Sequence, residues 1–143
     1  MLKEFGERPE VDRQRLNAEY NLVATLDPTR PIIMSTSTSW GIPARRPLPN
    51  VVGFSMYNIV FNKGAYRLSL YYPIAFRVRA LLIKIIWAKP SFIHELQAEP
   101  WGPKAIWEMS SNKQDKSMNA AQLQNNIILA KKTRLSHVDL WGG

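Results

Sequence analysis

Short apolar runs that alternate with helical segments are the feature that most limits how this chain can fold. Four such runs have the length, composition and polar or prolyl borders of buried strands: "PIIMS" (31–35), "VVGFSMY" (51–57), "SFIHEL" (91–96) and "LSHVDLW" (135–141). Near-continuously apolar strands that alternate with helices are typical of a parallel sheet covered by helices. The sequence therefore predicts the α/β class.

Three segments repeat their apolar residues at the spacing of one helical face. The first runs from about Glu10 to Leu26, and Asp27-Pro28 ends it because proline disfavours helical geometry in the residue before it. The others cover 74–88 and about 117–132, and the apolar face of 74–88 is wide enough to be largely buried. The three faces consist of Leu16, Tyr20 and Val23; Phe76, Ala80, Ile83 and Trp87; and Ala120, Leu123, Ile127 and Ala130.

Long connections follow two of the predicted strands, at 58–72 and 97–116, whereas the helix-to-strand connection "AKP" is short. Parallel α/β folds build their sites from the connections at the carboxyl edge of the sheet. This asymmetry favours a (β/α)8-type arrangement, with a doubly wound open sheet as the alternative. No glycine-rich phosphate loop follows a strand, which counts against nucleotide binding. Segment 36–50 holds three prolines and is expected to be an irregular crossover.

Composition excludes several classes of function. At 143 residues and 45% hydrophobic, the chain suits one globular domain, and without cysteine it has no disulfide or thiolate metal site. The net charge of +8 is spread over separate clusters without a nucleic-acid-reading motif, so no nucleic-acid partner is predicted. No metal or cofactor is predicted either, since His94 and His137 lie far apart in sequence.

Neither a transmembrane segment nor an export signal is predicted. The most apolar stretch, 73–88, carries three cations in 16 residues and is shorter than the roughly 20 apolar residues that span a bilayer. Residues 1–10 contain no apolar run of the kind a signal peptide needs. Localisation stays open, and a longer parent protein could be exported or membrane-anchored.

Aromatic and polar residues gather at the predicted strand ends. Aromatic faces stack on the apolar faces of sugar rings, while amides and carboxylates bind hydroxyls, so such a set suits an oligo- or polysaccharide. The alternative is that the tryptophans have a structural role and only fill the end of a barrel. The strand-end residues are Ser35 to Ser39 and Trp40; Ser55 and Tyr57; His94, Glu95 and Gln97; and Asp139 and Trp141.

The segments "FIHELQAEPWGP" and "HVDLWGG" resemble the seventh and eighth strands of retaining glycoside hydrolases in the large clan that contains family 5 cellulases and mannanases and family 42 β-galactosidases. The segments "LDPTRPIIMSTSTSW" and "VVGFSMYNIV" are similar to that clan's fifth and sixth strands. The resemblance covers residues 10 to 143. It implies that 1–143 is a single unit, a partial TIM barrel made of about the last four βα units.

The resemblance also implies roles for individual residues. Glu95 matches the catalytic nucleophile, Tyr57 the tyrosine that hydrogen-bonds and orients it, and Trp141 the tryptophan that forms the floor of the sugar subsite. His94 stands where the clan has a threonine or similar small residue. Trp40, Gln97 and Trp101 have no exact counterpart in the clan, but their chemistry suits contacts with a sugar. The expected substrate-binding residues are Trp141, Trp40, Gln97, Trp101 and His94.

One departure from the clan limits what this chain can do alone. The clan keeps its acid/base glutamate in an Asn-Glu-Pro motif after the fourth strand, and this sequence has only Ala98-Glu99-Pro100 after the seventh-strand match. Residues four apart in an extended strand lie roughly 13 Å apart, whereas retention needs carboxyl groups about 5–5.5 Å apart. Glu99 is therefore expected to be a loop or supporting carboxylate.

The expected whole is a C-terminal half-barrel that carries the nucleophile, with a missing N-terminal half as its partner. The isolated half is expected to be inactive and to expose two strand edges and an apolar interior. Two alternatives remain at this stage: a noncatalytic carbohydrate-binding or assembly half, and a basic module that binds anionic polymers.

Overall fold

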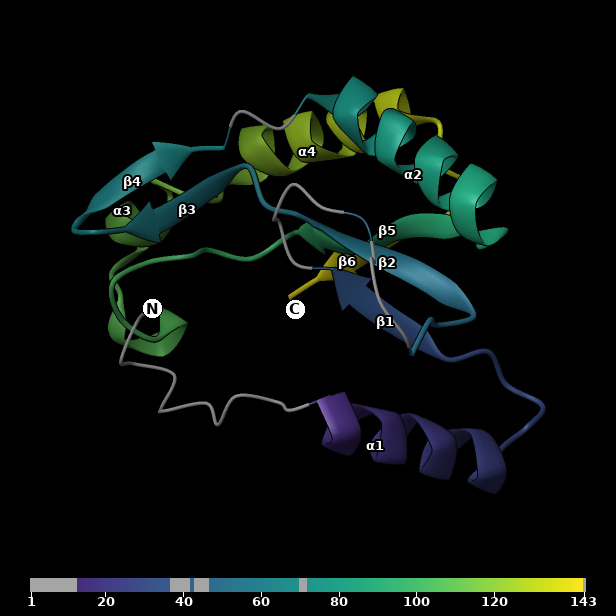
Figure 1. Cartoon of the computed structure of the whole chain (residues 1–143). Helices are drawn as coiled ribbons and strands as arrows, with labels where there is room; N and C mark the ends of the chain where they lie inside the picture. The colour runs from purple at the N-terminus through teal and green to yellow at the C-terminus, as the bar shows by residue number, and fades with distance from the viewer. Residues whose placement is uncertain (1–12, 37–41, 43–46, 70–71, 143) are drawn as a thin grey trace.

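A computed structural model describes residues 13–36, 42, 47–69 and 72–142. Four strands form one sheet: β1 (Ile33–Thr36), β2 (Val51–Met56), β5 (Ser91–Gln97) and β6 (Val138–Trp141). They lie side by side in chain order, and each neighbouring pair is parallel. The predicted α/β class and the four predicted strands are therefore confirmed (Figure 1).

Two helices, α2 (Pro73–Trp87) and α4 (Ala120–Thr133), lie side by side over one face of this sheet (Figure 1). Both agree closely with the helices expected at 74–88 and 117–132. Each ends at a residue in the left-handed conformation, Ala88 and Arg134, whose N–H bonds back to the last turn. Asn119 begins α4 by accepting a hydrogen bond from the backbone N–H of Gln122.

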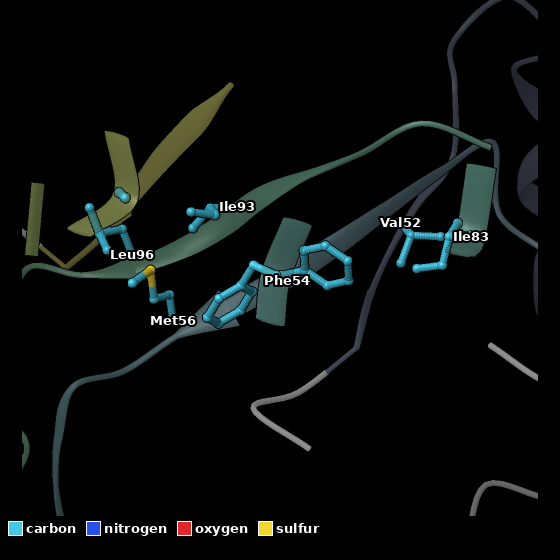
Figure 2. Close-up of a cluster of buried hydrophobic side chains, with 8 residues drawn as sticks. Val52, Phe54, Met56, Ile83, Ile93 and Leu96 are labelled. Atoms are coloured by element: carbon cyan, nitrogen blue, oxygen red, sulfur yellow. The ribbon is translucent and has the colours of Figure 1, made fainter. Parts of the chain in front are cut away.

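The core lies between the helices and the sheet. Alternate residues of β2, namely Val52, Phe54 and Met56, point into it together with Ile93 and Leu96 of β5 (Figure 2). Phe76 and Ile83 of α2 and Ala130 of α4 complete the cluster. Complete burial of one such side chain stabilises the fold by about 1.5–3 kcal/mol, so this face of the sheet holds the described fold together.

Helix α2 is less buried than the sequence predicts. Its expected inward face is present, but only Phe76, Arg79 and Ile83 are buried, and the residues on the opposite side are apolar and exposed. Arg79 lies with its guanidinium 4.5 Å from the ring centroid of Phe54, so this cation packs on an aromatic face of the core. Among the described residues, no helix is long and apolar enough to cross a membrane.

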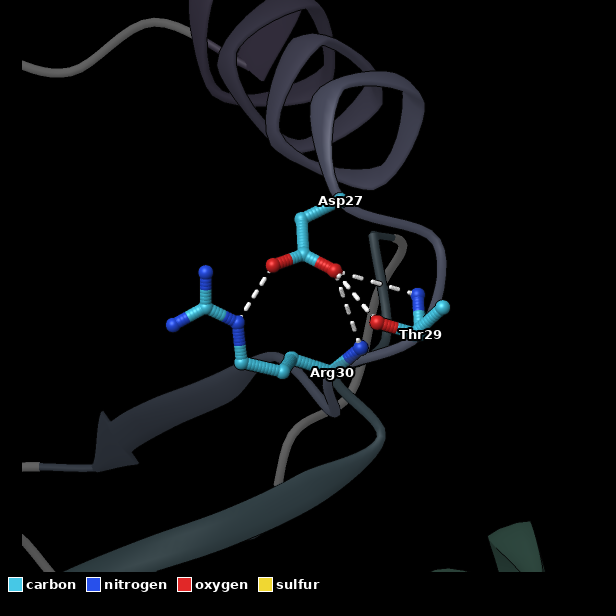
Figure 3. A network of polar contacts seen from close by, with 3 residues as sticks. All are labelled: Asp27, Thr29 and Arg30. Atoms are coloured by element: carbon cyan, nitrogen blue, oxygen red, sulfur yellow. Dashed lines mark hydrogen bonds and ion pairs between the residues drawn. The ribbon is translucent and has the colours of Figure 1, made fainter.

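Helix α1 (Arg13–Leu26) ends where the sequence predicts, although its expected start near Glu10 lies outside the described residues. The carboxylate of Asp27 accepts hydrogen bonds from Thr29 and Arg30, which turn the chain toward β1 (Figure 3). These bonds, led by that from the Thr29 hydroxyl, lower the pKa of Asp27. No residue of α1 is buried, so its expected apolar face does not pack into the core.

The long connections contain structure that the sequence analysis did not predict. Segment 58–72 forms an antiparallel hairpin of β3 (Ile59–Asn62) and β4 (Ala65–Leu68), joined by Lys63 and Gly64, both at positive φ. Segment 97–116 contains a 3-10 turn (Ile106–Glu108) and the short helix α3 (Ser111–Gln114). Much of the predicted crossover at 36–50 lies outside the described residues.

Candidate functional site

Polar and aromatic side chains meet at the carboxyl edge of the sheet, on the face that α2 and α4 do not cover. Successive residues of a strand point to opposite faces, so Ser55 and Tyr57 lie opposite Phe54 and Met56. In register, Ser55 pairs with Glu95 and Gln97 with Trp141. The sheet therefore brings the ends of β2, β5 and β6 together.

Glu95 is held by two hydroxyl groups. The Ser55 hydroxyl donates to Glu95 Oε2 over 2.9 Å, and the Tyr57 hydroxyl donates to the same oxygen over 3.0 Å. The hydroxyls of Ser35 and Ser55 lie 3.2 Å apart and extend this network across β1. Both donors reach Oε2, and within the described part of the chain no hydrogen bond is formed to Glu95 Oε1, which leaves that oxygen open to another group.

Tyr57 keeps its proton in this setting. It is only 7% exposed, and burial followed by its hydrogen bond to Glu95 raises the pKa of its hydroxyl. A raised pKa leaves the hydroxyl protonated across the neutral range, and only the protonated form can donate to a carboxylate. The hydrogen bond that the resemblance implied between Tyr57 and Glu95 is thus present.

Three aromatic rings surround this carboxylate edge, and we call Tyr57, Trp101 and Trp141 the aromatic triad. Ring centroids lie 5.5 Å apart for Tyr57 and Trp101, 5.6 Å for Tyr57 and Trp141, and 6.2 Å for the two tryptophans. The backbone N–H of Trp101 donates to the Ser117 hydroxyl, which fixes the loop after β5. The carbonyl of Trp141 accepts from the backbone N–H of Ala98.

A bulge in β5 places two consecutive residues on the same face as the triad. The pairing runs from Phe54 with Ile93 to Ser55 with Glu95, so His94 is an extra residue opposite β2. Ile93 and Leu96 both point into the core, which leaves His94 and Glu95 together on the uncovered face. Sequence alternation alone would have placed His94 and Glu95 on opposite faces.

His94 belongs to a small polar cluster on β5 and β6. Asp139 lies between two histidines, with Oδ1 at 2.6 Å from His137 Nε2 and Oδ2 at 3.5 Å from His94 Nδ1. All three side chains are partly open to solvent. Among the described residues, no group of three histidine, aspartate or glutamate side chains is arranged to hold a metal ion.

Gln97 does not fit its predicted role as a substrate contact. Its side chain is 0% exposed, and its Oε1 accepts from the backbone N–H groups of Asn58 and Ile59. Its Nε2 donates to the Ile59 carbonyl over 2.7 Å. The side chain is thus committed to the turn between β2 and β3, and this geometry argues against the predicted substrate contact.

The remaining predicted residues divide by position. Trp101, Trp141 and His94 lie at the uncovered edge beside Glu95, whereas Trp40 lies outside the described residues. Glu99 is in the loop after β5, as expected. Its side chain packs so closely on Gly142 that a Cβ added at Gly142 would lie 2.4 Å from Glu99 Cβ. The sequence indicated Ser55 and Asp139 only as strand-end residues. Their contacts with Glu95 and His94 depend on the register of the strands, which the sequence does not reveal.

The chain matches no family model, and comparisons with curated proteins and with solved structures found no match either.

Proposed function

We propose that this chain is the C-terminal half of a retaining glycoside hydrolase, with Glu95 as the nucleophile. The observation that carries the proposal is the setting of Glu95. One oxygen is held by Ser55 and Tyr57, the other is left for a substrate, and the aromatic triad stands beside it. A carboxylate with one anchored oxygen and an adjacent aromatic surface suits attack on a sugar.

The strand arrangement supports a barrel as the parent fold. The strands β1, β2, β5 and β6 follow one another in chain order without the reversal that defines a doubly wound sheet. The two packed helices cover one face only. In a (β/α)8 barrel the strands run in chain order, helices lie outside, and the site is at the carboxyl ends. The proposed parent fold is therefore a barrel to which this chain contributes strands five to eight.

The proposed chemistry needs two carboxyl groups. Glu95 Oε1 attacks the anomeric carbon, and the bond to the leaving oxygen breaks as that oxygen takes a proton from a glutamate in the other half of the barrel. Water then attacks the glycosyl-enzyme ester, giving one proton to the same glutamate and releasing Glu95 as a carboxylate. Ser55 and Tyr57 orient Glu95, and the aromatic triad stacks on the sugar ring.

The test is a pair of variants in the completed parent enzyme. Glu95→Gln keeps the shape of the side chain but removes the nucleophile, so turnover should fall by at least about 1,000-fold while sugar binding persists. Glu99→Gln is the matched control, since this loop carboxylate packs on Gly142, and it should cost less than about tenfold.

Covalent labelling identifies the nucleophile directly. Dinitrophenyl 2-deoxy-2-fluoroglycosides of gluco, manno and galacto configuration should trap an ester on the peptide that contains Glu95. Mass spectrometry of the digested protein locates the label. A label on Glu99, or near-normal turnover of Glu95→Gln, would overturn the assignment.

A further inference from the structure

Helix α2 carries a second apolar face that nothing in the described structure covers. Its residues recur at intervals of three and four, so they form one stripe along the helix, opposite Phe76 and Ile83. Leu81 is 57% exposed and Ile85 is 70% exposed. We call this set the outer stripe: Ile74, Val78, Leu81, Leu82, Ile85 and Ile86.

The charged side chains of α2 and of its neighbour α4 all have one sign. Neither α2 nor α4 contains an acidic residue. Arg77 and Lys84 are exposed on α2, and Lys131 and Lys132 are exposed in the last turn of the neighbouring α4. The carboxylates Glu95 and Asp139 instead lie on the opposite face of the sheet. The helical layer is thus both apolar at its surface and positively charged.

This combination argues against two occupants. A second copy of the chain, docked through the same stripe, would bring Arg77 and Lys84 of both copies together without any helical carboxylate to offset them. The other half of a barrel would cover the sheet edges and complete the face that holds Glu95. It would not reach the side of α2 that points away from the sheet.

We propose that the outer stripe binds the surface of an anionic phospholipid bilayer. The helix would lie flat, with the stripe among the upper acyl chains and Arg77 and Lys84 beside the phosphates, as interfacial amphipathic helices do. Because the helices lie on one side of the sheet, Glu95 and the aromatic triad would face away from the bilayer. The proposal goes beyond the glycosidase assignment and does not depend on it.

Vesicle flotation with the full chain tests the proposal. The protein should float with phosphatidylcholine vesicles that contain about one third phosphatidylglycerol, should bind pure phosphatidylcholine far more weakly, and should be released by salt. Leu81→Gln/Ile85→Gln should weaken binding at least about tenfold. The matched control, Leu22→Gln/Leu26→Gln, changes two exposed leucines of α1 and should leave binding within about twofold.

A second pair of variants tests the charges. Arg77→Gln/Lys84→Gln should weaken binding about 30-fold, because each basic residue near an anionic surface contributes about 1 kcal/mol, or about fivefold. Lys63→Gln/Arg67→Gln removes the same charge from the hairpin and should change binding less than about threefold. Since all of these residues are exposed, circular dichroism should show unchanged folding.

Three results would overturn the proposal. The first is absence of binding to anionic vesicles by the unmodified chain. The second is binding that survives Leu81→Gln/Ile85→Gln. The third is an oligomer that forms without lipid and is dissociated by that variant, which would assign the stripe to a second copy. Each readout is vesicle binding or mass, so failure here leaves the glycosidase proposal to be judged by its own labelling test.

Discussion

At the scale of single residues, Glu95 and Gln97 show how two polar side chains near the end of one strand acquire different tasks. Glu95 meets only hydroxyl donors at one of its oxygens and keeps the other for a further partner. Gln97 has both ends of its amide bound to the backbone of residues 58 and 59. An amide that satisfies three backbone groups stabilises a turn, and its complete burial keeps it away from the open side of the site.

The role of Gln97 predicts a large loss of stability for Gln97→Leu. The substitution leaves the N–H groups of Asn58 and Ile59 and the Ile59 carbonyl without their partner, which should cost about 2–5 kcal/mol. Gln124→Leu on the exposed side of α4 is the control and should change stability by less than about 0.5 kcal/mol. Urea unfolding followed by circular dichroism measures both. Equal stability of the two variants would return Gln97 to the list of candidate ligands.

At the scale of elements, the bulge in β5 depends on a glycine in the neighbouring strand. A Cβ added at Gly53 would lie 2.7 Å from His94 Cβ, a distance that no side-chain rotation can relieve because the contact involves the first carbon of each side chain. Gly53 thus gives His94 its room beside β2. Glycine is needed at position 53 because a side chain would not fit there. Its backbone does not require glycine, since the φ angle of Gly53 is not positive.

We therefore predict that Gly53→Ala destabilises the chain by about 1–3 kcal/mol, the usual cost of overpacking. His94→Gly alone should also destabilise, because glycine weakens a strand. The double variant Gly53→Ala/His94→Gly removes the clash and should be more stable than the sum of the single effects by at least about 1 kcal/mol. A double-mutant cycle from urea unfolding gives this value, and simple additivity would rule out the proposed contact.

At the scale of the whole molecule, the sheet has one covered face and one uncovered face. The expectation that an isolated half would expose an apolar interior stays a prediction. In the described part of the chain, the uncovered side carries the aromatic triad together with Ser35, Ser55, His94, Glu95 and Asp139. The expected exposed edges are present, since β1 and β6 end the sheet. Unpaired strand edges promote pairing with other chains.

The edges predict self-association of the isolated chain, which sedimentation velocity can measure. Ile33→Lys/Leu140→Lys adds a cation to each exposed edge strand and should reduce the associated fraction at least about threefold. Leu22→Lys/Leu26→Lys adds the same charge on the exposed side of α1, away from any strand, and should have little effect. A monomeric chain with a sharp cooperative melt would count against the half-barrel proposal.

The sequence by itself determined the local elements of this protein. Strands at 31–35, 51–57, 91–96 and 135–141 were predicted from short apolar runs with polar or prolyl borders, and helices near 74–88 and 117–132 from periodicity. Both are patterns among near neighbours, and the structure has a strand or helix at each of these places. The sequence also indicated Glu95, Tyr57, Trp101 and Trp141, because residues after parallel strands gather at one edge of the sheet. The hairpin in 58–72 was missed, since its turn uses Lys63 rather than the usual asparagine or aspartate.

Only the tertiary structure decided which of these residues meet and which are taken up by packing. The bulge that sets His94 beside Glu95 depends on how β5 pairs with β2, and the hydrogen bonds of Gln97 depend on the backbone of residues 58 and 59. The outer stripe is exposed because no described element packs against that side of α2. Periodicity gives each residue a face, but register and the neighbouring layer decide what that face contacts. Those are properties of several segments together, and no local pattern contains them.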